Sequence, residues 1–437
     1  MITWKPPLLL GIGLATLWLW PDPWLALLAL AAALLLACAV DLLITPAPGA
    51  LQLARSGARV VRIGEEALVD LYVTNPTEYA YRLQVRDAWV PSAGASPYHH
   101  ALELEPDETA TLTTTLRPTR RGDRPAVRVT LRAYGPLGLT FRQAGHARAD
   151  KMTPQWTLRV LPRFDSRRYL PEKLAKLRTV EGATAIRGRG QGTEFDALRE
   201  YVVGDDVRSI DWRATARRND VVVRTWRPER SRRVVCVLDT GRTSAVRVGD
   251  VPRLDHAIEA ALLLAAVAEK AGDQVDLIAA DERVRAQVTR AAGRNLLPKL
   301  VDALAPLEPA VAETDFELVS SEVLRTERKR SLIVLFTALE PGALGEGLLP
   351  VLPRLAARHS VLIAALHDPV ISEMISSAPV DPPSVYRRVA GLRAREDRDR
   401  VSKALSRHGV RVLDAPADLF ASAVTDVYLE LKATGRL

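Results

Sequence analysis

Cysteine is nearly absent from the sequence, and this scarcity excludes a secreted, disulfide-rich module. The chain of 437 residues has two cysteines, Cys38 and Cys236, which lie far apart in apolar runs. Two isolated cysteines supply neither a disulfide framework nor the paired ligands of a metal site, so both are predicted to be buried thiols. Free thiols suit a reducing compartment.

The sequence also lacks a charge imbalance strong enough to identify a partner. Its 60 Lys and Arg residues exceed its 52 Asp and Glu residues by eight, which gives a net charge of +8. This balance permits an acidic partner or an anionic membrane surface but specifies neither. Charged residues make up 26% and hydrophobic residues 48% of the chain, which excludes a wholly disordered protein. The length allows two to four domains.

Charge is scarcest in residues 1–46, which carry only Lys5, Asp22 and Asp41. The run Trp24 to Ile44 would rise about 31 Å as a helix, enough to cross the hydrocarbon layer. The run Pro7 to Trp20 is shorter, but a proline-bounded turn follows it and no signal-peptide cleavage site does. We therefore predict a two-helix membrane hairpin over residues 1–46. The alternative is one span plus a short buried helix.

Basic residues predict how this hairpin is oriented. Lys5 precedes the first helix and Arg55, Arg59 and Arg62 follow the second, whereas the connecting turn has no Lys or Arg. The positive-inside rule then places both ends on the cytoplasmic side. We predict two spans in the plasma (inner) membrane, with both termini and the soluble domains in the cytoplasm. The one-span alternative would place the soluble part outside.

A small antiparallel β-sandwich is predicted for residues 55–162. Segments such as Leu68 to Asn75, Ala110 to Leu116 and Val127 to Ala133 alternate or are rich in Val, Leu and Thr, and turn-forming residues separate them. Short strands at such spacing are typical of sandwiches. We expect this domain to act as a spacer or docking surface.

Residues 187–233 mix opposite charges, with 12 basic and eight acidic side chains. The spacing Gly188-x-Gly190-x-Gly192 could hold phosphate, but no strand precedes it and no Gly-Lys-Ser/Thr follows. Aromatic residues among the arginines could stack on nucleic-acid bases, but the interleaved acids would repel phosphates. We favour a third interpretation, in which arginine–carboxylate pairs connect an extended segment to its neighbours, and we expect no nucleic-acid partner.

From Val234 onward, short apolar strands alternate with amphipathic helices. Strands are expected at Val234–Asp239, Val275–Ala279, Leu332–Phe336, Val361–Leu366 and Val410–Leu413, and helices at Leu254–Ala271 and Asp418–Leu431. This alternation predicts a doubly wound parallel sheet covered on both faces. Ligands of such sheets lie at the carboxyl ends of the strands, where Asp239 stands before Thr243 and Ser244. Their oxygens suit a hard cation such as Mg²⁺.

The segment Gly192 to Arg217 closely resembles the signature of the bacterial domain of unknown function 58 family. The pattern is Gly-x-Glu-Phe, Leu-Arg-Glu-Tyr, Gly-Asp-Asp-x-Arg, Ile-Asp-Trp and Ala-x-Ala-Arg. Arg120-Arg121-Gly122 and Pro136-Leu137-Gly138-Leu139 look like further family motifs. The signature and interaction residues expected from the resemblance are Glu194, Phe195, Arg199, Glu200, Tyr201, Gly204, Asp205, Asp206, Arg208, Asp211, Trp212 and Arg217.

This resemblance implies a von Willebrand factor type A-like α/β domain over residues 231–437, preceded by a signature segment over residues 163–230. Members usually accompany a MoxR-type AAA+ ATPase, and no enzymatic activity is established for them. The resemblance therefore implies a membrane-anchored scaffold that acts with such an ATPase and a protein client, in assembly or chaperone-like work. The expected partners are that ATPase, the client and the lipid bilayer.

Type A domains hold a divalent ion with an Asp-x-Ser-x-Ser loop, a distant Thr and a later Asp. On this sequence Asp239 matches the first position, Thr243 the last and Thr314 the distant Thr. Gly241 stands where a hydroxyl is expected, Ala338 replaces the later Asp, and Glu340 is out of register. The resemblance thus implies at most Mg²⁺ at a degenerate site, and otherwise no cofactor.

An enzyme is the alternative to a scaffold. Clustered carboxylates support two-metal hydrolysis, and Asp205, Asp206, Asp211 and Asp239 could form such a cluster. Neighbouring arginines would compete for these carboxylates, and no Ser-His-Asp set is apparent. We therefore expect a chain that is not an enzyme.

Overall fold

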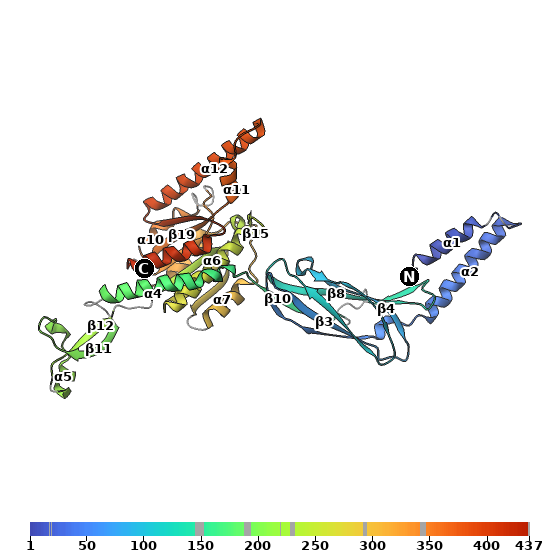
Figure 1. Ribbon diagram of the computed structural model, residues 1–437, viewed down its shortest axis with the longest axis horizontal. Helices are drawn as coiled ribbons and strands as arrows, with labels where there is room; N and C mark the ends of the chain where they lie inside the picture. The colour runs from blue at the N-terminus through green and yellow to red at the C-terminus, as the bar shows by residue number, and fades with distance from the viewer. Residues whose placement is uncertain are drawn as a thin grey trace. The chain divides into compact units, whose positions relative to one another are not determined.

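The computed structural model describes residues 1–16, 18, 20–144, 153–187, 194–218, 220–227, 232–291, 295–340 and 347–435. The chain divides into two compact units, Met1–Leu161 and Pro162–Leu437 (Figure 1). The glycine-spaced loop between Gly188 and Gly192 lies outside the described residues.

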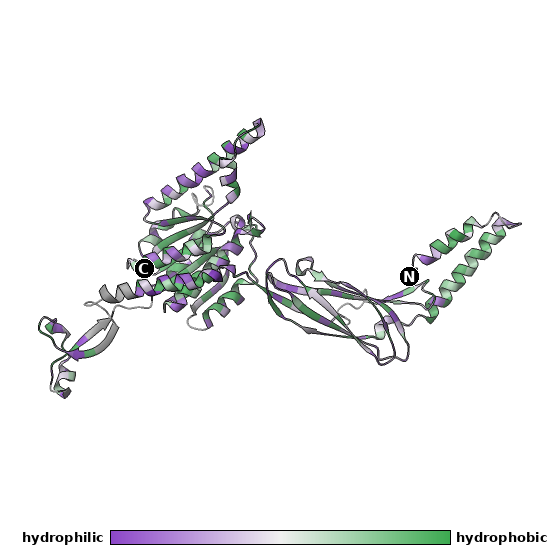
Figure 2. Ribbon diagram, in the orientation of Figure 1, coloured by the Kyte–Doolittle hydropathy of each residue, from purple (hydrophilic) through white to green (hydrophobic). Residues whose placement is uncertain are grey.

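The first unit begins with two apolar helices, α1 (Lys5–Ala15) and α2 (Pro23–Ile44), which lie side by side (Figure 1). A Cβ atom at Gly13 would overlap the Leu30 side chain, so the glycine allows the helices to approach closely. The carboxylate of Asp22 caps α2 by accepting hydrogen bonds from the backbone N–H groups of Trp24 and Leu25. Hydrophobic residues dominate both helices (Figure 2).

Among the described helices, α2 has the length and composition needed to cross a membrane. Its 22 residues rise about 33 Å, whereas the 11 residues of α1 rise only about 16 Å. The structure thus supports one membrane-crossing helix near the N-terminus. The second crossing and the cytoplasmic orientation stay predictions.

Two sheets form the rest of this unit, between Gln52 and Leu161. One sheet has the order β1 (Gln52–Gly57), β3 (Ala67–Thr74), β7 (Thr109–Leu116) and β5 (Ala95–Ser96). The other has the order β2 (Val60–Arg62), β10 (Thr157–Leu161), β8 (Gly122–Tyr134), β4 (Tyr81–Trp89) and β6 (His99–Leu104), and β9 (Phe141–Ala144) pairs with β8. These pairs are antiparallel except β2 with β10.

The sandwich core forms because alternate side chains of each strand point inward. Every second residue of β3 and of β4 is buried, as the period of a strand requires. Leu71 from one sheet and Leu83 and Leu131 from the other share one apolar cluster. Val69, Trp89 and Leu158 belong to a second cluster. The unit is therefore sandwich-like, as the sequence predicts.

The second unit contains a six-stranded sheet. Its order is β17 (Val284–Ala291), β16 (Gln274–Ala280), β13 (Arg233–Asp239), β18 (Leu332–Phe336), β19 (Ser360–His367) and β20 (Arg411–Pro416). The strands are parallel except β17, which pairs antiparallel with β16. The wholly parallel sheet that the sequence predicted is therefore wrong at this edge, because a short turn returns the chain directly alongside β16.

Helices cover both faces of this sheet. Val234, Cys236 and Leu238 of β13 point to one core, which is shared with α4 (Leu170–Arg187), α6 (Arg253–Lys270), α7 (Leu296–Leu304) and α13 (Phe420–Ala433). Val235 and Val237 point to the other, which is shared with α8 (Phe316–Thr326), α10 (Leu352–Ala356) and α12 (Pro382–Arg407). The mixed α/β class is thereby confirmed. Cys236 is a buried free thiol, whereas Cys38 on α2 is only half-buried.

The charged segment forms a small substructure with its own two-stranded sheet. β11 (Glu194–Glu200) pairs antiparallel with β12 (Val222–Arg227), and the short helix α5 (Trp212–Arg218) lies between them in the sequence. We call residues 194–227 the signature module. The sequence predicted an extended segment here, but not the hairpin pairing.

Candidate functional site

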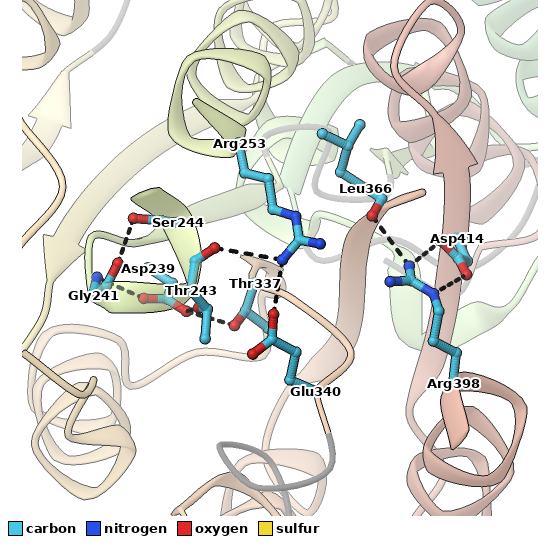
Figure 3. Close-up of polar contacts among 10 residues, drawn as sticks. All are labelled: Asp239, Gly241, Thr243, Ser244, Arg253, Thr337, Glu340, Leu366, Arg398 and Asp414. Carbon is cyan, nitrogen blue, oxygen red and sulfur yellow. Dashed lines mark hydrogen bonds and ion pairs between the residues drawn. The ribbon is translucent and has the colours of Figure 1, made fainter. Parts of the chain in front are cut away.

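The carboxylate of Asp239, at the end of β13, is the centre of a buried hydrogen-bond cluster (Figure 3). Its Oδ1 accepts hydrogen bonds from the backbone N–H of Gly241 at 2.8 Å and from the hydroxyl of Thr314 at 2.5 Å. Its Oδ2 accepts from the hydroxyls of Thr337 at 2.6 Å and Thr243 at 3.2 Å. All four donors therefore converge on one acidic side chain, which we call the Asp239 cluster.

The structure brings the three predicted ligands Asp239, Thr243 and Thr314 together, and it adds Thr337, which the sequence analysis missed. Thr337 directly follows β18, so its place at the carboxyl end of a parallel strand was a usable signal. A Cβ atom at Gly241 would overlap the Thr314 hydroxyl. The serine hydroxyl that the type A pattern expects there has no room.

The donor set is poorer in carboxylates than the ion site that the type A pattern describes. Mg²⁺ requires near-octahedral oxygen ligands, usually with one or two carboxylates. Here Asp239 is the single carboxylate, its hydroxyl neighbours already donate to it, and buried Ala338 offers no ligand. The described residues contain no group of three or more His, Cys, Asp or Glu side chains that could hold a metal. The adjoining cavity of about 20 Å³ has room for roughly one water molecule.

An arginine lies beside the cluster. Arg253, the first residue of α6, donates from Nη1 to Glu340 Oε1 at 2.9 Å and to the Thr243 carbonyl oxygen at 3.5 Å (Figure 3). Its Nε is buried without a hydrogen-bond partner. Glu340 is out of register as a metal ligand. It is instead the ion-pair partner of the largely buried Arg253.

A second arginine anchors α12 to the same edge of the sheet. Arg398 contacts both carboxylate oxygens of Asp414 on β20, at 3.1 Å from Nε and 2.7 Å from Nη2. Its Nη2 also donates to the Leu366 carbonyl oxygen at 3.1 Å (Figure 3). This bidentate pair connects a long helix to two strands.

Asp281 is a second buried carboxylate at this edge, just beyond β16. Burial favours its neutral form, but hydrogen bonds from Arg285, the Thr240 hydroxyl and the Arg283 backbone outweigh burial, so the pKa of Asp281 lies below its ordinary value. Asp281 is thus a charged structural group.

In the signature module, two ion pairs brace the loops. Arg199 Nη2 lies 2.5 Å from Asp205 Oδ1, and Asp205 Oδ2 accepts from the Val202 backbone N–H. Arg224 Nε lies 2.8 Å from Asp211 Oδ2, and Asp211 also accepts hydrogen bonds from the first turn of α5. The arginine hydrogen bonds hold the pKa of both aspartates below the ordinary value. Each aspartate therefore stabilises its own turn.

The remaining signature residues have mostly local roles. Asp206 accepts from the Arg208 backbone N–H, Gly204 has a positive φ of 110°, and the Tyr201 N–H donates to the Val221 carbonyl. Glu200 and Arg217 are exposed. Glu194 and Phe195 lie in β11 opposite Arg227 and Trp226, and their side chains are outside the described part of the chain.

Apolar side chains of the module face solvent. Val203 is 94% exposed and Trp212 is 66% exposed, and Val202 and Val207 are exposed as well. Large apolar side chains that gather on a surface mark interaction sites more often than single ones do. The module thus exposes four large apolar side chains, those of Val202, Val203, Val207 and Trp212.

The hydrolase carboxylates are not assembled as a metal-holding group among the described residues. Asp205, Asp206 and Asp211 each accept backbone hydrogen bonds in separate turns, and Asp239 is enclosed by its own donors. The expected arginine–carboxylate network exists for two pairs. Its charges are not buried, however, since the side chains of Arg199 and Arg224 are 46% and 47% exposed.

In the first unit, a buried joint connects α2 to the sandwich. The carboxylate of Asp41 accepts from the backbone N–H groups of Leu137 (2.8 Å), Leu139 (3.0 Å) and Thr140 (2.7 Å), and from the Thr140 hydroxyl (2.9 Å). A Cβ atom at Gly135 would overlap this carboxylate, so the turn requires glycine there. We call these contacts the Asp41 joint.

The start of the chain completes the joint. The Met1 carbonyl accepts from the Phe141 N–H at 2.8 Å, and the Thr3 hydroxyl donates to the Gly138 carbonyl at 2.9 Å. The Pro136-Leu137-Gly138-Leu139 motif therefore contacts both the segment before α1 and the end of α2.

The fold and these sites define an α/β protein with an N-terminal apolar helix and a β-sandwich-like domain. Residues 197–381 match the model of the family described as "Protein of unknown function DUF58". Uncharacterized proteins of Mycobacterium tuberculosis and Mycobacterium bovis are 27% identical over 183 residues, which is 41% of this chain and 56% of each relative. The chain thus spans about half the length of the curated relatives it matches. The resemblance inferred from the signature is confirmed.

Solved structures match about a quarter of the chain. A CARDB domain from Pyrococcus furiosus is 17% identical, covers 25% of this chain and 86% of that chain, and has a TM-score of 0.19. An Escherichia coli alpha-2-macroglobulin is 19% identical, covers 26% and 16%, and has a TM-score of 0.21. Likeness at this level carries no information about function.

Proposed function

We propose that this chain is a membrane-anchored interaction protein that acts with a MoxR-type AAA+ ATPase on a protein client, in assembly or chaperone-like work, and that it is not an enzyme. The observation that carries the proposal is the exposure of Val203 and Trp212 in the signature module. The charged residues of the module pair with one another and hold its turns in place. Exposed tryptophan with apolar neighbours is typical of interface hot spots.

The α/β domain supports the same role. Its mostly parallel sheet, covered by helices on both faces, and the Asp239 cluster at the end of β13 support a type A-like domain. The Asp239 cluster lacks the later carboxylate of the type A ion site, because Ala338 stands in its place. We therefore assign no cofactor to it.

The N-terminal part supports anchoring in the inner membrane. α2 supplies one span, and we propose that the apolar run Pro7 to Trp20, which includes most of α1, supplies the second, so that both termini and the soluble domains lie in the cytoplasm. The Asp41 joint then fixes the sandwich to the helix that crosses the bilayer.

Co-purification with the ATPase tests the proposal. The full-length protein, in detergent, is captured with the MoxR-type ATPase of the same organism, with and without Trp212→Ala or Val203→Asp. We expect either substitution to reduce the recovered ATPase at least about tenfold, because truncating a hot spot costs 2 kcal/mol or more.

Val311→Asp is the matched control, since Val311 is also 94% exposed but lies outside the signature module. It should leave recovery unchanged. Undiminished recovery with both module variants would contradict the proposal. Phosphatase, nuclease or nucleotide-hydrolysis turnover by the isolated chain that Asp205→Ala removes would also contradict it.

A further inference from the structure

The first half of α12 packs against one neighbouring helix and exposes its other side. α11 (Pro369–Ser376) lies against it at Gly391, where a Cβ atom would come within 3.0 Å of the Met374 side chain. The glycine therefore allows the two helices to pack closely. The other buried residues of α12, Arg398 and Leu405, belong to its second half, which packs on the sheet. The first half extends beyond the sheet alongside α11 (Figure 1).

The exposed side of this half carries a row of apolar side chains. Val385, Val389 and Leu392 are exposed, and their spacing of four and three residues places them in one row along the helix. At about 100° per residue, the row lies on the far side of the helix from Gly391. Tyr386 lies next to the row and is 77% exposed. We call this side of residues 385–393 the α12 outer face.

Arginines border the row on both sides. Arg388 and Arg393 each lie about 70° around the helix from it, in opposite directions. Residues 382–395 contain no Asp or Glu, and all their basic side chains are exposed. These basic residues are Arg387, Arg388, Arg393 and Arg395. Acidic residues begin only at Glu396, which pairs with Arg400. Positive charge and apolar surface are therefore concentrated in the same half of the helix.

We propose that the α12 outer face binds an anionic bilayer surface; this inference rests on the cytoplasmic, membrane-anchored placement in the proposed function. The cytoplasmic leaflet carries anionic lipids, which attract basic segments. The apolar row enters the boundary between headgroups and acyl chains, as in helices that lie on a membrane. Arg388 and Arg393 lay their aliphatic stems along the row and bind lipid phosphates with their guanidinium groups.

The combination of row and charge favours a bilayer over an acidic protein surface. An acidic protein surface would account for the arginines, but it would leave Val385, Val389 and Leu392 without apolar partners. A bilayer accounts for both, because it offers phosphates above a hydrocarbon layer. The two occupants are therefore separated by whether binding requires the apolar row.

Vesicle binding tests the inference. The full-length protein is held in nanodiscs of phosphatidylcholine, which keep α2 in a bilayer, and is mixed with separate vesicles of equal parts phosphatidylcholine and phosphatidylglycerol. Flotation of the vesicles measures the bound protein, and vesicles of phosphatidylcholine alone should bind none. The double variant Arg388→Gln, Arg393→Gln should weaken binding at least about tenfold, because each arginine adds to the attraction. Val389→Asp should also weaken it, because a carboxylate disfavours entry of the row.

The double variant Lys403→Gln, Arg407→Gln is the matched control. It removes the same two charges from exposed positions in the second half of α12, so it should leave vesicle binding unchanged. An equal loss in both double variants would overturn the inference, since the vesicles would then report only net charge. Undiminished binding of Val389→Asp would also overturn it, in favour of a face that recognises charge alone, as an acidic protein surface requires.

Failure here is distinguishable from failure of the proposed function. Vesicle binding depends on the α12 outer face, whereas co-purification of the ATPase is tested at Trp212 and Val203. If the unchanged protein does not bind anionic vesicles but co-purifies the ATPase through Trp212, only the α12 inference is rejected. If vesicle binding depends on Arg388 and Arg393 but no ATPase is recovered, the α12 inference is supported and the proposed partnership is rejected.

Discussion

The Asp41 joint and the signature module both use aspartate as a hydrogen-bond acceptor, but in opposite surroundings. Asp41 is fully buried and accepts from residues nearly one hundred positions away. Asp205 and Asp211 lie at the surface and accept from residues within 13 positions. The buried carboxylate holds two parts of the fold together, whereas the exposed ones only shape turns. Similar motifs therefore contribute very differently to stability.

Asp41→Ala should give the largest effect. It leaves three backbone N–H groups and one hydroxyl without their acceptor, so the free energy of unfolding of the first unit should fall by about 3–5 kcal/mol. Denaturant unfolding of the full-length protein in detergent, followed by tryptophan fluorescence, measures this loss. Asp22→Ala is the control, because Asp22 is an exposed helix cap that should contribute only about 1 kcal/mol. Equal losses in both variants would contradict the expectation that the buried Asp41 contributes more to stability than an exposed aspartate does.

Arg398→Ala should give an intermediate effect. It breaks a bidentate pair in which Arg398 is nearly buried and Asp414 is 31% exposed, so we expect a loss of about 2 kcal/mol after discounting for solvent screening. Hydrogen exchange in α12 should rise with it, since the helix loses its anchor to β20. Arg400→Ala, two residues along the same helix, removes exposed ion pairs and should cost less than about 1 kcal/mol.

The difference between local and distant contacts also explains which features could be predicted from the sequence. The alternation of apolar strands and amphipathic helices is a local pattern, so β13, β18 and α6 lie within about one residue of their predicted bounds. Thr243 falls beside Asp239 because only three residues of one loop separate them. β17 was missed because most of its side chains are exposed and give no continuous apolar run.

The remaining parts depend on contacts distant in sequence. Asp41 looks like a lone acid in a membrane helix, because its partners are backbone groups of a turn nearly one hundred positions away in the sequence. Thr337 was overlooked because the pattern calls for a carboxylate at Ala338, the next position. The pairing of Glu340 with Arg253 depends on how two loops meet, and their 87-residue separation gives no periodic signal.

Neutralising the signature ion pairs should have the smallest effect on stability. Arg199→Ala and Arg224→Ala each remove an exposed partner from a half-buried aspartate that keeps its backbone hydrogen bonds, so the melting temperature at pH 7 should stay nearly unchanged. The arginines lower the pKa of Asp205 and Asp211 in the folded state. Any stabilisation is therefore complete above the unfolded pKa of about 4 and is lost as the pH falls through the lower folded pKa. Melting curves from pH 7 to pH 3 for each variant and the unchanged protein should nearly coincide. A marked divergence above pH 4 that disappears below it would show that these pairs hold the fold together as the Asp41 joint does.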